Sequence, residues 1–423
     1  MPETLTTLDK LLKDVYQNVV REQINTFSGL QQLFEKVEDA EFDGRKVIEG
    51  TSMSFNEGVG AIGEDANLPT AGQLVPEQFN IYMKYIYGSF QMTKQMMETA
   101  KSSKGAFKNA TRYSFETLVR NMKRERARML WGAGTGALAR VNDATPDGAT
   151  AVGIDDPGGI TGTFGGTRYL RKNMIICLGA TPAAGIVRTI STVDSGTQIT
   201  LDSATSGGAD NNLIYRISTT GSTAAGDSAK DNEPVGLLGL IDDGTYLATL
   251  SGLSRATYPQ LNAYCSASVG ALSLDLIQQH FDIADQKGDG EIDAMACHHA
   301  VRRAYLTLLE ADRRYTGSDL ASPDGGTKAA KRGQYVTFAG KSMIEDKYAP
   351  YDMLFGVCKA DMKRYVQIDG EWAEESGAIL RQVTGKDTWT AFYRLWENYH
   401  CSRPNTNFRM SGITTSKIYV QDY

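Results

Sequence analysis

The stretch DQKGDGEID, which begins at Asp285, has the carboxylates and the central glycine of a calcium-binding loop. An EF-hand loop needs side-chain oxygens at positions 1, 3 and 5, a glycine at position 6 and a glutamate at position 12. Counted from Asp285, positions 5 and 6 are Asp289 and Gly290, but position 3 is Lys287 and position 12 is Ala296. A lysine and an alanine cannot supply the missing oxygens. We therefore expect a polar glycine turn between two regular elements.

A second candidate for chemistry is the triplet Cys297, His298 and His299. Adjacent residues on one element point in different directions, and zinc-type ligand spacing is missing. The chain has two other histidines, His280 and His400, and it has no nucleophile elbow, zinc-protease motif or P-loop. We therefore expect no catalytic residues, no cofactor and no metal site, and we interpret the chain as a non-enzyme.

The stretch GAGTGA, residues 132 to 137, matches a dinucleotide-binding fingerprint by its letters. That fingerprint must follow a strand and open a helix. Here the glycines follow the clearest helix of the sequence, predicted from Lys104 to Trp131, where they would cap its end. We therefore expect no nucleotide site.

This long helix, about 40 Å at 1.5 Å per residue, is basic in its second half. Its basic residues are Arg120, Lys123, Arg124, Arg126 and Arg128. Only Glu125 opposes them in this half. Such a face is either solvated and salt-bridged or in contact with the phosphate backbone of DNA, and the pattern leaves both interpretations open.

Composition and charge limit the class of protein. The chain has 423 residues, 41% hydrophobic and 22% charged, as in ordinary globular proteins of two or three domains. The net charge of −6 argues against a surface that binds nucleic acid everywhere. Five widely spaced cysteines without a CxxC pair indicate reduced thiols. Without a signal peptide or an apolar run of about 18 residues, we expect a soluble protein made in the cytoplasm.

The first forty residues contain an amphipathic helix, because apolar residues recur at steps of three and four. They are Leu8, Leu11, Leu12, Val15, Val19 and Val20. Such a narrow apolar stripe must dock either on its own domain or on a neighbouring molecule.

A glycine-rich segment from Glu49 to Gln78 has few large apolar residues, and long segments of this kind are usually functional or disordered. The alternation that follows predicts a long strand with one apolar face. That face is Phe79, Ile81, Met83, Tyr85 and Tyr87. We expect a hairpin that projects from the body and buries its apolar residues only on another molecule.

From residue 147 to 234 the composition shifts to Gly, Ser, Thr and Asp with short β-type runs, which predicts a small β-sandwich or barrel. The remainder alternates helical patterns with strand patterns, among them SLDLIQQHFDIADQ and CHHAVRRAYLTLLEADRRY as helices and DTWTAFYRLWENYHC as a strand. The class is therefore α+β.

The order of these elements resembles a tailed-bacteriophage major capsid protein of the Hong Kong 97 type. Four segments carry the resemblance: GVGAIGEDANLP (Gly58 to Pro69), FETLVRNMKRERARMLWGAGTGALA (Phe115 to Ala139), EPVGLLGLIDDGTY (Glu233 to Tyr246) and AMACHHAVRRAYLTLLEADRRY (Ala294 to Tyr315). Together the likeness spans nearly the whole chain, and the β-rich insert departs from the minimal fold.

The resemblance implies an α+β Hong Kong 97-like fold with defined parts. They are the N-terminal arm (1–45), the extended hairpin loop (46–92), the peripheral domain (93–146) with its spine helix (104–131), the inserted β-rich subdomain (147–235), the axial domain (236–378) and the returning peripheral strand (379–423). The subunit-contact residues of the extended loop would be Gly58, Val59, Ile62, Glu64 and Leu68.

The resemblance also implies a function: copies assemble into pentamers and hexamers of an icosahedral shell that encloses double-stranded DNA in a virion. Expected partners are the chain itself, a portal, scaffolding or decoration proteins, and DNA held weakly and non-specifically by the basic helix. The sequence shows no helical leader of the kind many such proteins carry, which suggests separate scaffolding or none. Two alternatives stay open: the shell of an encapsulin-like protein nanocompartment, and a calcium-dependent β-rich tail or surface protein.

Overall fold

Most of the chain is described by a computed structural model. The described residues are 29–37, 46–54, 56–64, 67–96, 104–142, 148–162, 164–179, 185–205, 210–218, 227–311, 336–374, 379–416 and 418. The amphipathic helix expected over the first forty residues lies outside these ranges, except for the short 3-10 helix η1 (Gly29–Leu33).

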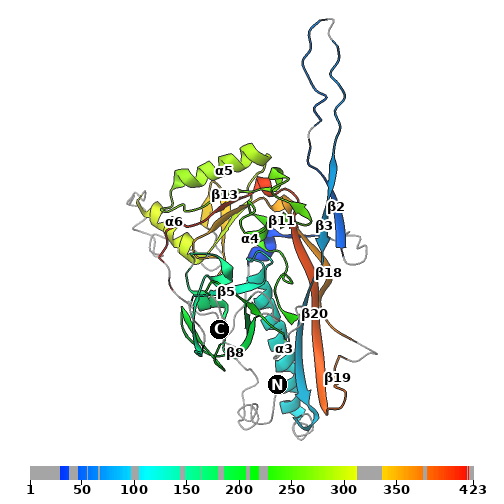
Figure 1. Cartoon of the computed structure of the whole chain (residues 1–423), viewed down its shortest axis with the longest axis vertical. Helices are drawn as coiled ribbons and strands as arrows, with labels where there is room; N and C mark the ends of the chain where they lie inside the picture. The colour runs from blue at the N-terminus through cyan, green and yellow to red at the C-terminus, as the bar shows by residue number, and fades with distance from the viewer. Residues whose placement is uncertain are drawn as a thin grey trace, which may run out of the picture.

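Two larger sheets, a closed barrel, a long helix and a projecting hairpin make up the described part of the molecule (Figure 1). The helix α3 (Lys104–Met129) runs beside the first sheet, and the hairpin leaves the body and points away from α3. Neither a proline nor, after Gly105, a glycine interrupts α3, which confirms the expected long helix. It ends at Met129, earlier than Trp131, because the last bonds tighten to the i−3 pattern before the glycine-rich turn.

The first sheet is built around one long strand, β20. Its members are β1 (Glu35–Lys36), β4 (Lys84–Thr93), β18 (Met362–Trp372), β19 (Arg381–Gln382) and β20 (Thr388–Cys401). Strand β20 pairs antiparallel with β4 along one edge and with β18 and β19 along the other. Helix α3 packs closely on β4 at Gly88, where an added Cβ would lie 2.9 Å from the sulfur of Met122. A side chain at this position would require the side chains of Met122 and Leu118 to move.

The projecting hairpin begins and ends in paired strands. They are β2 (Lys46–Ser52) and β3 (Pro76–Tyr82). Antiparallel pairing runs from Lys46 opposite Tyr82 to Ser52 opposite Pro76. Beyond the last pair, the described residues 53, 54, 56–64 and 67–75 form the thin arm seen in Figure 1.

The single strand expected after Gln78 is two strands, β3 and β4, with a break at Met83. Phe79 and Met83 lie on one buried face, as the alternation predicted, but they are buried by Leu253, Leu261 and Tyr365 of the same chain, so the expectation that the hairpin buries its apolar residues only on another molecule was wrong for them. Beyond the break the alternation changes phase, so Ile86 is buried while Tyr85 and Tyr87 are exposed. The prediction that these two tyrosines share a face with Phe79 was wrong, because β3 pairs with β2 whereas β4 changes partner to β20.

The second sheet has six strands in the order β13-β21-β17-β14-β16-β15 and carries two helices. These elements are β13 (Tyr264–Ser266), α5 (Leu274–Gly288), β14 (Ala294–Cys297), α6 (His299–Ala311), β15 (Val336–Phe338), β16 (Lys341–Glu345), β17 (Leu354–Val357) and β21 (Phe408–Met410). Met295 and Cys297 join the core under α5 and α6, whereas Ala294 and Ala296 face the core on the other side. Both predicted helices are confirmed within the described residues, although the second begins at His299 because Cys297 belongs to β14.

Residues 137–216 contain a closed barrel with strand order β10-β5-β6-β9-β8-β7. Its strands are β5 (Ala137–Val141), β6 (Ala151–Asp155), β7 (Ile175–Leu178), β8 (Ile186–Ser195), β9 (Gln198–Leu201) and β10 (Leu213–Arg216). The sequence placed the start of the β-rich insert at residue 147. The barrel begins earlier, at Ala137, because β5 closes it by pairing with both β10 and β6.

The two sheets do not follow the expected boundary at residue 379. Strand β18 belongs by sequence to the segment 236–378, yet it pairs with β20 in the first sheet. Strand β21 belongs to the segment 379–423, yet it pairs with β17 and β13 in the second sheet. After β17 the chain therefore crosses between the sheets twice, from β17 to β18 and from β20 to β21, and each sheet contains strands from both segments.

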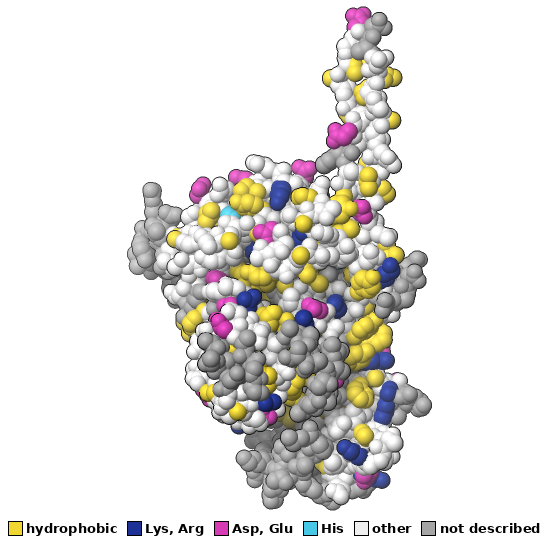
Figure 2. All heavy atoms as spheres, viewed as in Figure 1, with side chains coloured by type: hydrophobic (Ala, Val, Ile, Leu, Met, Phe, Trp, Pro, Cys, Tyr) yellow, Lys and Arg dark blue, Asp and Glu magenta, His cyan; other side chains and the backbone are white. Residues whose placement is uncertain are grey.

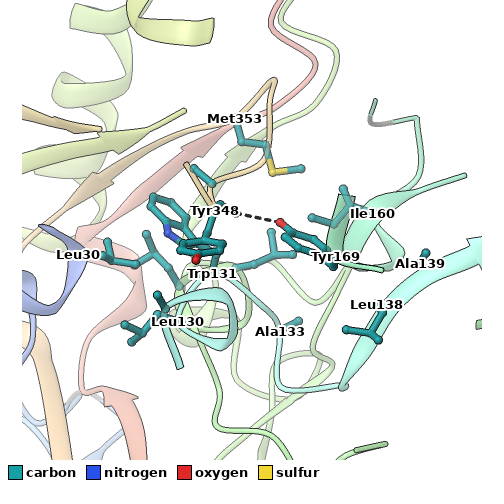
Figure 3. Packing of buried hydrophobic residues seen from close by; sticks show 14 of the residues in the cluster. Leu30, Leu130, Trp131, Ala133, Leu138, Ala139, Ile160, Tyr169, Tyr348 and Met353 are labelled. Carbon is teal, nitrogen blue, oxygen red and sulfur yellow. Dashed lines mark hydrogen bonds between the residues drawn. The ribbon is translucent and has the colours of Figure 1, made fainter. Parts of the chain in front are cut away.

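One hydrophobic core joins the barrel, the end of α3 and the second sheet (Figure 3). The ring of Trp131 lies 5.8 Å from that of Phe355 in β17. The hydroxyl of Tyr169 donates a hydrogen bond to the carbonyl of Tyr348 at 2.9 Å. The barrel thus shares its core with the body.

The body also contains α4 (Leu237–Leu240), β11 (Thr249–Leu250) and β12 (Leu253–Ser254).

Candidate functional site

The residues predicted to contact a neighbouring subunit all lie on the projecting arm of the hairpin. They are Gly58, Val59, Ile62, Glu64 and Leu68. Val59 is 87% exposed and Leu68 is 81% exposed. Figure 2 shows the arm as a narrow projection from the body, with apolar side chains on the face in view. The described residues leave Val59 and Leu68 largely uncovered, so burial of these side chains against a further surface would be favourable.

The two halves of the arm approach each other at Gly58 and Gly72. A Cβ on Gly58 would lie 2.7 Å from the nitrogen of Gly72, and a Cβ on Gly72 would lie 2.0 Å from Oδ1 of Asn56. The N–H of Gly58 donates to Oδ1 of Asn56 at 2.9 Å, and the N–H of Val75 donates to the hydroxyl of Ser54 at 2.8 Å. Glycine is therefore needed at both positions, since any side chain would separate the two halves.

A half-buried carboxylate fixes the base of the hairpin to the first sheet. Glu49 of β2 accepts hydrogen bonds from Nζ of Lys363 at 2.8 Å and from the hydroxyl of Tyr365 at 2.7 Å. It also accepts one from the hydroxyl of Ser402 at 2.9 Å, and Nε2 of His400 lies 4.0 Å away. These partners come from β18 and from the end of β20, so one side chain ties the hairpin to two strands.

The electrostatics of this base keep Glu49 charged and His400 neutral. Burial alone would raise the pKa of Glu49, but the hydrogen bonds from Lys363, Tyr365 and Ser402 lower it below its usual value. Burial lowers the pKa of His400 to about 4. The ring of Phe79 meets the His400 ring edge-on, with centroids 4.5 Å apart.

The basic half of α3 does not form one solvent-facing stripe. Arg124 is 1% exposed and Arg128 is 7% exposed. Arg126 is paired with the fully buried Glu397, at 2.6 Å from Nε to Oε1 and 2.8 Å between the second guanidinium nitrogen and Oε2. The interpretation of these three arginines as DNA-facing is therefore corrected: their side chains are enclosed by the protein itself.

Glu125, the single acid in this half of the helix, is the centre of an ionic hub. Its carboxylate pairs with Nε of Arg128 at 3.2 Å, with Arg171, and with a guanidinium nitrogen of Arg216 at 3.1 Å. Arg128 also pairs with Glu233. Burial would raise the pKa of Glu125, but the three arginines lower it to about 2. Because Arg171 and Arg216 belong to the barrel segment, the hub clamps the barrel onto α3.

Sequence reasoning missed both buried carboxylate centres, Glu49 and Glu125. Except for Arg128, which follows Glu125 on the same helix, their partners lie far away along the chain, so no local pattern could reveal the two centres. The nearest signal in the sequence is Glu125, the single acid in the basic half of the long helix. The sequence does not show whether the carboxylate of Glu125 faces water or the core.

The two remaining basic residues line a groove on the side of α3. Lys123 is exposed and Arg120 is half-buried. Together with Phe115, Val119 and Trp372 they line a groove of about 410 Å³, which Glu116 also borders. The rings of Phe115 and Trp372 meet edge-on with centroids 4.5 Å apart. The groove therefore combines an apolar aromatic floor with a rim of mixed charge, formed by Arg120, Lys123 and Glu116.

The stretch that resembles a calcium loop is the end of α5. Asp285 and Lys287 lie in the last turn, and Asp289 ends the helix in the left-handed conformation with a φ of 48°. An added Cβ on Gly290 would lie 2.3 Å from the Cβ of Thr406, so this glycine allows a close contact between segments. The predicted glycine turn between two elements is confirmed. A helical Asp285 cannot take part in the loop geometry that an EF-hand ion requires.

Within the described ranges, one group of side chains has ligand atoms close enough to share a metal ion: Asp242, Asp243 and Cys265. Oδ2 of Asp242 already accepts backbone N–H donors from Gly244, Tyr246 and Leu247 at 2.8 to 3.1 Å. Oδ1 of Asp242 accepts from Arg409 at 2.8 Å. Burial raises the pKa of Cys265 to about 12, which keeps its thiol protonated. The carboxylate oxygens of Asp242 are therefore already used by backbone donors and by Arg409, with which Asp242 forms a buried ion pair.

The triplet Cys297, His298 and His299 points in different directions, as predicted. Burial raises the pKa of Cys297 to about 12. His298 stacks on Tyr351 with ring centroids 4.2 Å apart, and burial lowers its pKa to about 3. His299 lies instead 3.0 Å from Glu345. The rings of His298 and His299 meet edge-on with centroids 5.4 Å apart, but their other partners, Tyr351 and Glu345, differ.

The GAGTGA stretch joins α3 to β5, with φ values of 81° at Gly134 and 76° at Gly136. The order is helix, turn, strand, which is the reverse of a dinucleotide site, and the expectation of a helix-ending turn is confirmed.

None of the helices in the described ranges is long and apolar enough to cross a membrane.

Comparison with solved structures identifies the fold. The structure described as the cyanophage A-1(L) capsid asymmetric unit aligns with a TM-score of 0.55 over 98% of this chain and 100% of that chain, at 11% identity. The chain therefore has the mixed helix-and-sheet fold of that capsid structure. No family model matches the sequence, and no curated protein matches it.

Two other structures align more distantly. The capsid of a native GTA particle aligns with a TM-score of 0.47 at 8% identity, over 97% of this chain and 99% of that chain. A structure from Gordonia phage Cozz aligns with a TM-score of 0.44 at 10% identity, over 96% of this chain and 93% of that chain.

Proposed function

We propose that this chain is the major capsid protein of a tailed bacteriophage, a structural subunit of the Hong Kong 97 type without catalytic activity. The observation that carries the proposal is the likeness to the cyanophage capsid structure, which covers 98% of this chain and 100% of the other. A likeness that covers both chains so completely leaves no large part of either fold unexplained.

Copies of the chain assemble into pentamers and hexamers of an icosahedral shell around double-stranded DNA, and the protein resides in the virion. The projecting hairpin supports this assembly. Its apolar residues, such as Val59 and Leu68, have no partner surface on the arm itself, and a head-to-tail contact between identical subunits closes rings. A portal and scaffolding or decoration proteins would be further partners.

Each part of the fold takes a role in this proposal. The hairpin is the extended loop that lies over a neighbouring subunit. Helix α3 and the first sheet form the peripheral domain, and the second sheet with α5 and α6 forms the axial domain near the five-fold and six-fold axes. The barrel is an insert that is fused to this framework through the shared core.

The test is size exclusion followed by negative-stain electron microscopy, on the chain expressed alone and with its genomic neighbours. Closed shells or capsomer rings are expected. A small monodisperse species under both conditions would contradict the proposal. If shells hold enzyme cargo in place of DNA, the nanocompartment alternative replaces the phage capsid.

A further inference from the structure

We propose that β4, an edge strand of the first sheet, pairs antiparallel with β4 of a second copy of this chain, with Ser89 opposite Ser89 on a two-fold axis. The two first sheets then form one continuous sheet. The inference rests on the proposed function, because it names a further contact between copies. This contact uses backbone hydrogen bonds of the sheet and does not involve the hairpin.

One edge of β4 carries backbone groups without partners. The N–H of Lys94 donates to the carbonyl of Asp387 at 3.0 Å, in register with Thr93 opposite Thr388. Backbone groups of successive residues point to opposite sides of a strand, so the even-numbered residues of β4 bond to β20 and the odd-numbered residues face away. The described residues offer no hydrogen-bond partner to the outward backbone groups, which belong to Tyr85, Tyr87, Ser89, Gln91 and Thr93.

The usual ways of protecting an edge strand are missing from β4. Such strands are commonly very short, or they carry a proline, a bulge or a central charge. Strand β4 has ten residues without a proline, and its pairing with β20 runs without a register shift. Its one charged residue, Lys84, lies at the first position and donates to the carbonyl of Asp231 at 2.6 Å. The strands β1 and β19 on the other side of the sheet have two residues each, so β4 is the edge that can accept a further strand.

Helix α3 leaves this edge accessible because it packs on one face of the sheet. There Met122 clusters with Ile86 and Leu395, and Arg126 pairs with Glu397 of the central strand β20. On the opposite face, Tyr85 is 45% exposed and Tyr87 is 55% exposed. A strand can therefore approach the edge of β4 without displacing the helix.

An identical strand fits this edge because β4 is self-complementary. A two-fold axis perpendicular to the sheet places odd-numbered residues opposite odd-numbered residues and keeps the two faces matched. Centred on Ser89, the pairing uses every outward group from Tyr85 to Thr93 and places Tyr87 opposite Gln91. No charged residue lies between Tyr85 and Thr93, and the tyrosines gain cross-strand contacts. The contact is isologous, in contrast to the head-to-tail contacts that form rings.

Two lysines flank the paired region. In this register Lys84 of one copy lies opposite Lys94 of the other at each end. Salt screens the repulsion between like charges, so the contact should strengthen as the salt concentration rises.

The first experiment is disulfide formation in assembled particles of the full-length variant Ser89→Cys. Opposite residues of a hydrogen-bonded antiparallel pair have Cα atoms about 5.5 Å apart, within the range of about 4.4 to 6.8 Å that a disulfide needs. The matched control is Gln91→Cys, which is exposed on the same strand but lies about 14 Å from its own counterpart in this register. The natural cysteines are buried or half-buried, and unmodified particles give the background.

After mild oxidation, the inference predicts a covalent dimer from Ser89→Cys severalfold above the Gln91→Cys control on a non-reducing gel. Particles in which Ser89→Cys gives no more dimer than this control would overturn the inference while leaving the proposed function intact. That result would leave the edge to an extended segment of a different protein. If the unmodified chain forms neither rings nor shells, the proposed function fails, and the inference fails with it.

A proline provides the second test. Ser89→Pro removes an N–H that faces away from β20, a position where an edge strand tolerates proline, so the free subunit should keep its fold. It should lower the rate of assembly severalfold, because a strand cannot pair across the proline. Ser89→Thr keeps the N–H and should assemble at the wild-type rate. Denaturant unfolding checks the fold, and folded Ser89→Pro subunits that assemble as fast as Ser89→Thr would overturn the inference.

Discussion

The barrel and the hairpin both extend from the same framework, but they bury their apolar residues in opposite ways. Inside the barrel, side chains such as Ile154, Ile190 and Ile199 are 0% exposed. On the arm of the hairpin, Val59 and Leu68 are more than 80% exposed. The barrel is also clamped to α3 by the hub around Glu125, whereas the hairpin is held only at its base.

The difference shows which region can be stable within a single subunit. The barrel strands close on themselves and leave no free edge, so their core is complete without a partner. The arm closes no core, so its stability depends on whatever covers it. Substitutions in the barrel should therefore lower the stability of the free subunit. Substitutions in the arm should leave the stability of the free subunit unchanged and affect only the assembly.

The largest effect on the free subunit is expected from Glu125→Gln. The substitution leaves the charges of Arg128 and Arg171 buried or half-buried without their shared counter-charge, which should cost about 4 kcal/mol of unfolding free energy. Denaturant unfolding measures this loss. Glu116→Gln on the exposed side of the same helix is the control, with a change within about 0.5 kcal/mol. Equal losses for both variants would show that the hub does not clamp the barrel.

Acid should weaken the same hub. Because the folded-state pKa of Glu125 is lowered from 4.5 to about 2, its contribution is present above pH 4.5 and is lost as the pH falls towards 2. The stability difference between wild type and Glu125→Gln should therefore shrink by about 3 kcal/mol across this window. A difference that stays constant with pH would exclude this role of Glu125.

Ile190→Ala tests the core of the barrel directly. Removing buried methylene and methyl groups from a closed interior leaves a cavity, and we expect a loss of about 3 kcal/mol in unfolding free energy. The measurement is denaturant unfolding of the free subunit. A loss below about 1 kcal/mol would mean that the barrel interior is loosely packed, and the contrast with the arm would disappear.

Glu49→Gln tests the base of the hairpin. It removes the charge that accepts hydrogen bonds from Lys363 and Tyr365, and we expect a cost of about 2 kcal/mol. Denaturant unfolding measures this loss of unfolding free energy. Limited proteolysis should also cleave residues 46–82 faster in the variant than in the wild type. The matched control is Glu57→Gln on the arm, which should leave both the unfolding free energy and the rate of proteolysis unchanged.

The smallest effect on the free subunit is expected from Leu68→Ala. The side chain is 81% exposed, so its truncation should change the unfolding free energy by less than about 0.5 kcal/mol. Assembly should nevertheless slow, and light scattering follows it. A large loss of stability in the free subunit would show that the arm packs on its own body.

The elements that the sequence predicted correctly are those with a strong local pattern. Helix α3 contains no proline and no glycine after Gly105, and the glycines that follow Trp131 end it. The length of the helix and the turn after it can therefore be predicted from neighbouring residues. The change of phase at Met83 could not be predicted, because it arises when the strand changes partner from β2 to β20.

Charged residues were the hardest to place. Arg126 and its partner Glu397 lie 271 positions apart, so the basic spacing of α3 gave no sign that this arginine is enclosed. The barrel boundary was missed for a similar reason, because β5 looks like an isolated strand until β10 pairs with it. Local composition did identify the arm, since a glycine-rich segment with few apolar residues has little means of forming its own core.

Hydrogen–deuterium exchange on free subunits and on assembled particles tests the contrast between the two regions most directly. The amides of residues 53–75 should exchange rapidly in the free subunit and become protected in particles, while the strands of the barrel stay protected in both. Equally rapid exchange of the arm in both states would contradict the account, because the arm would then gain no cover from a second copy.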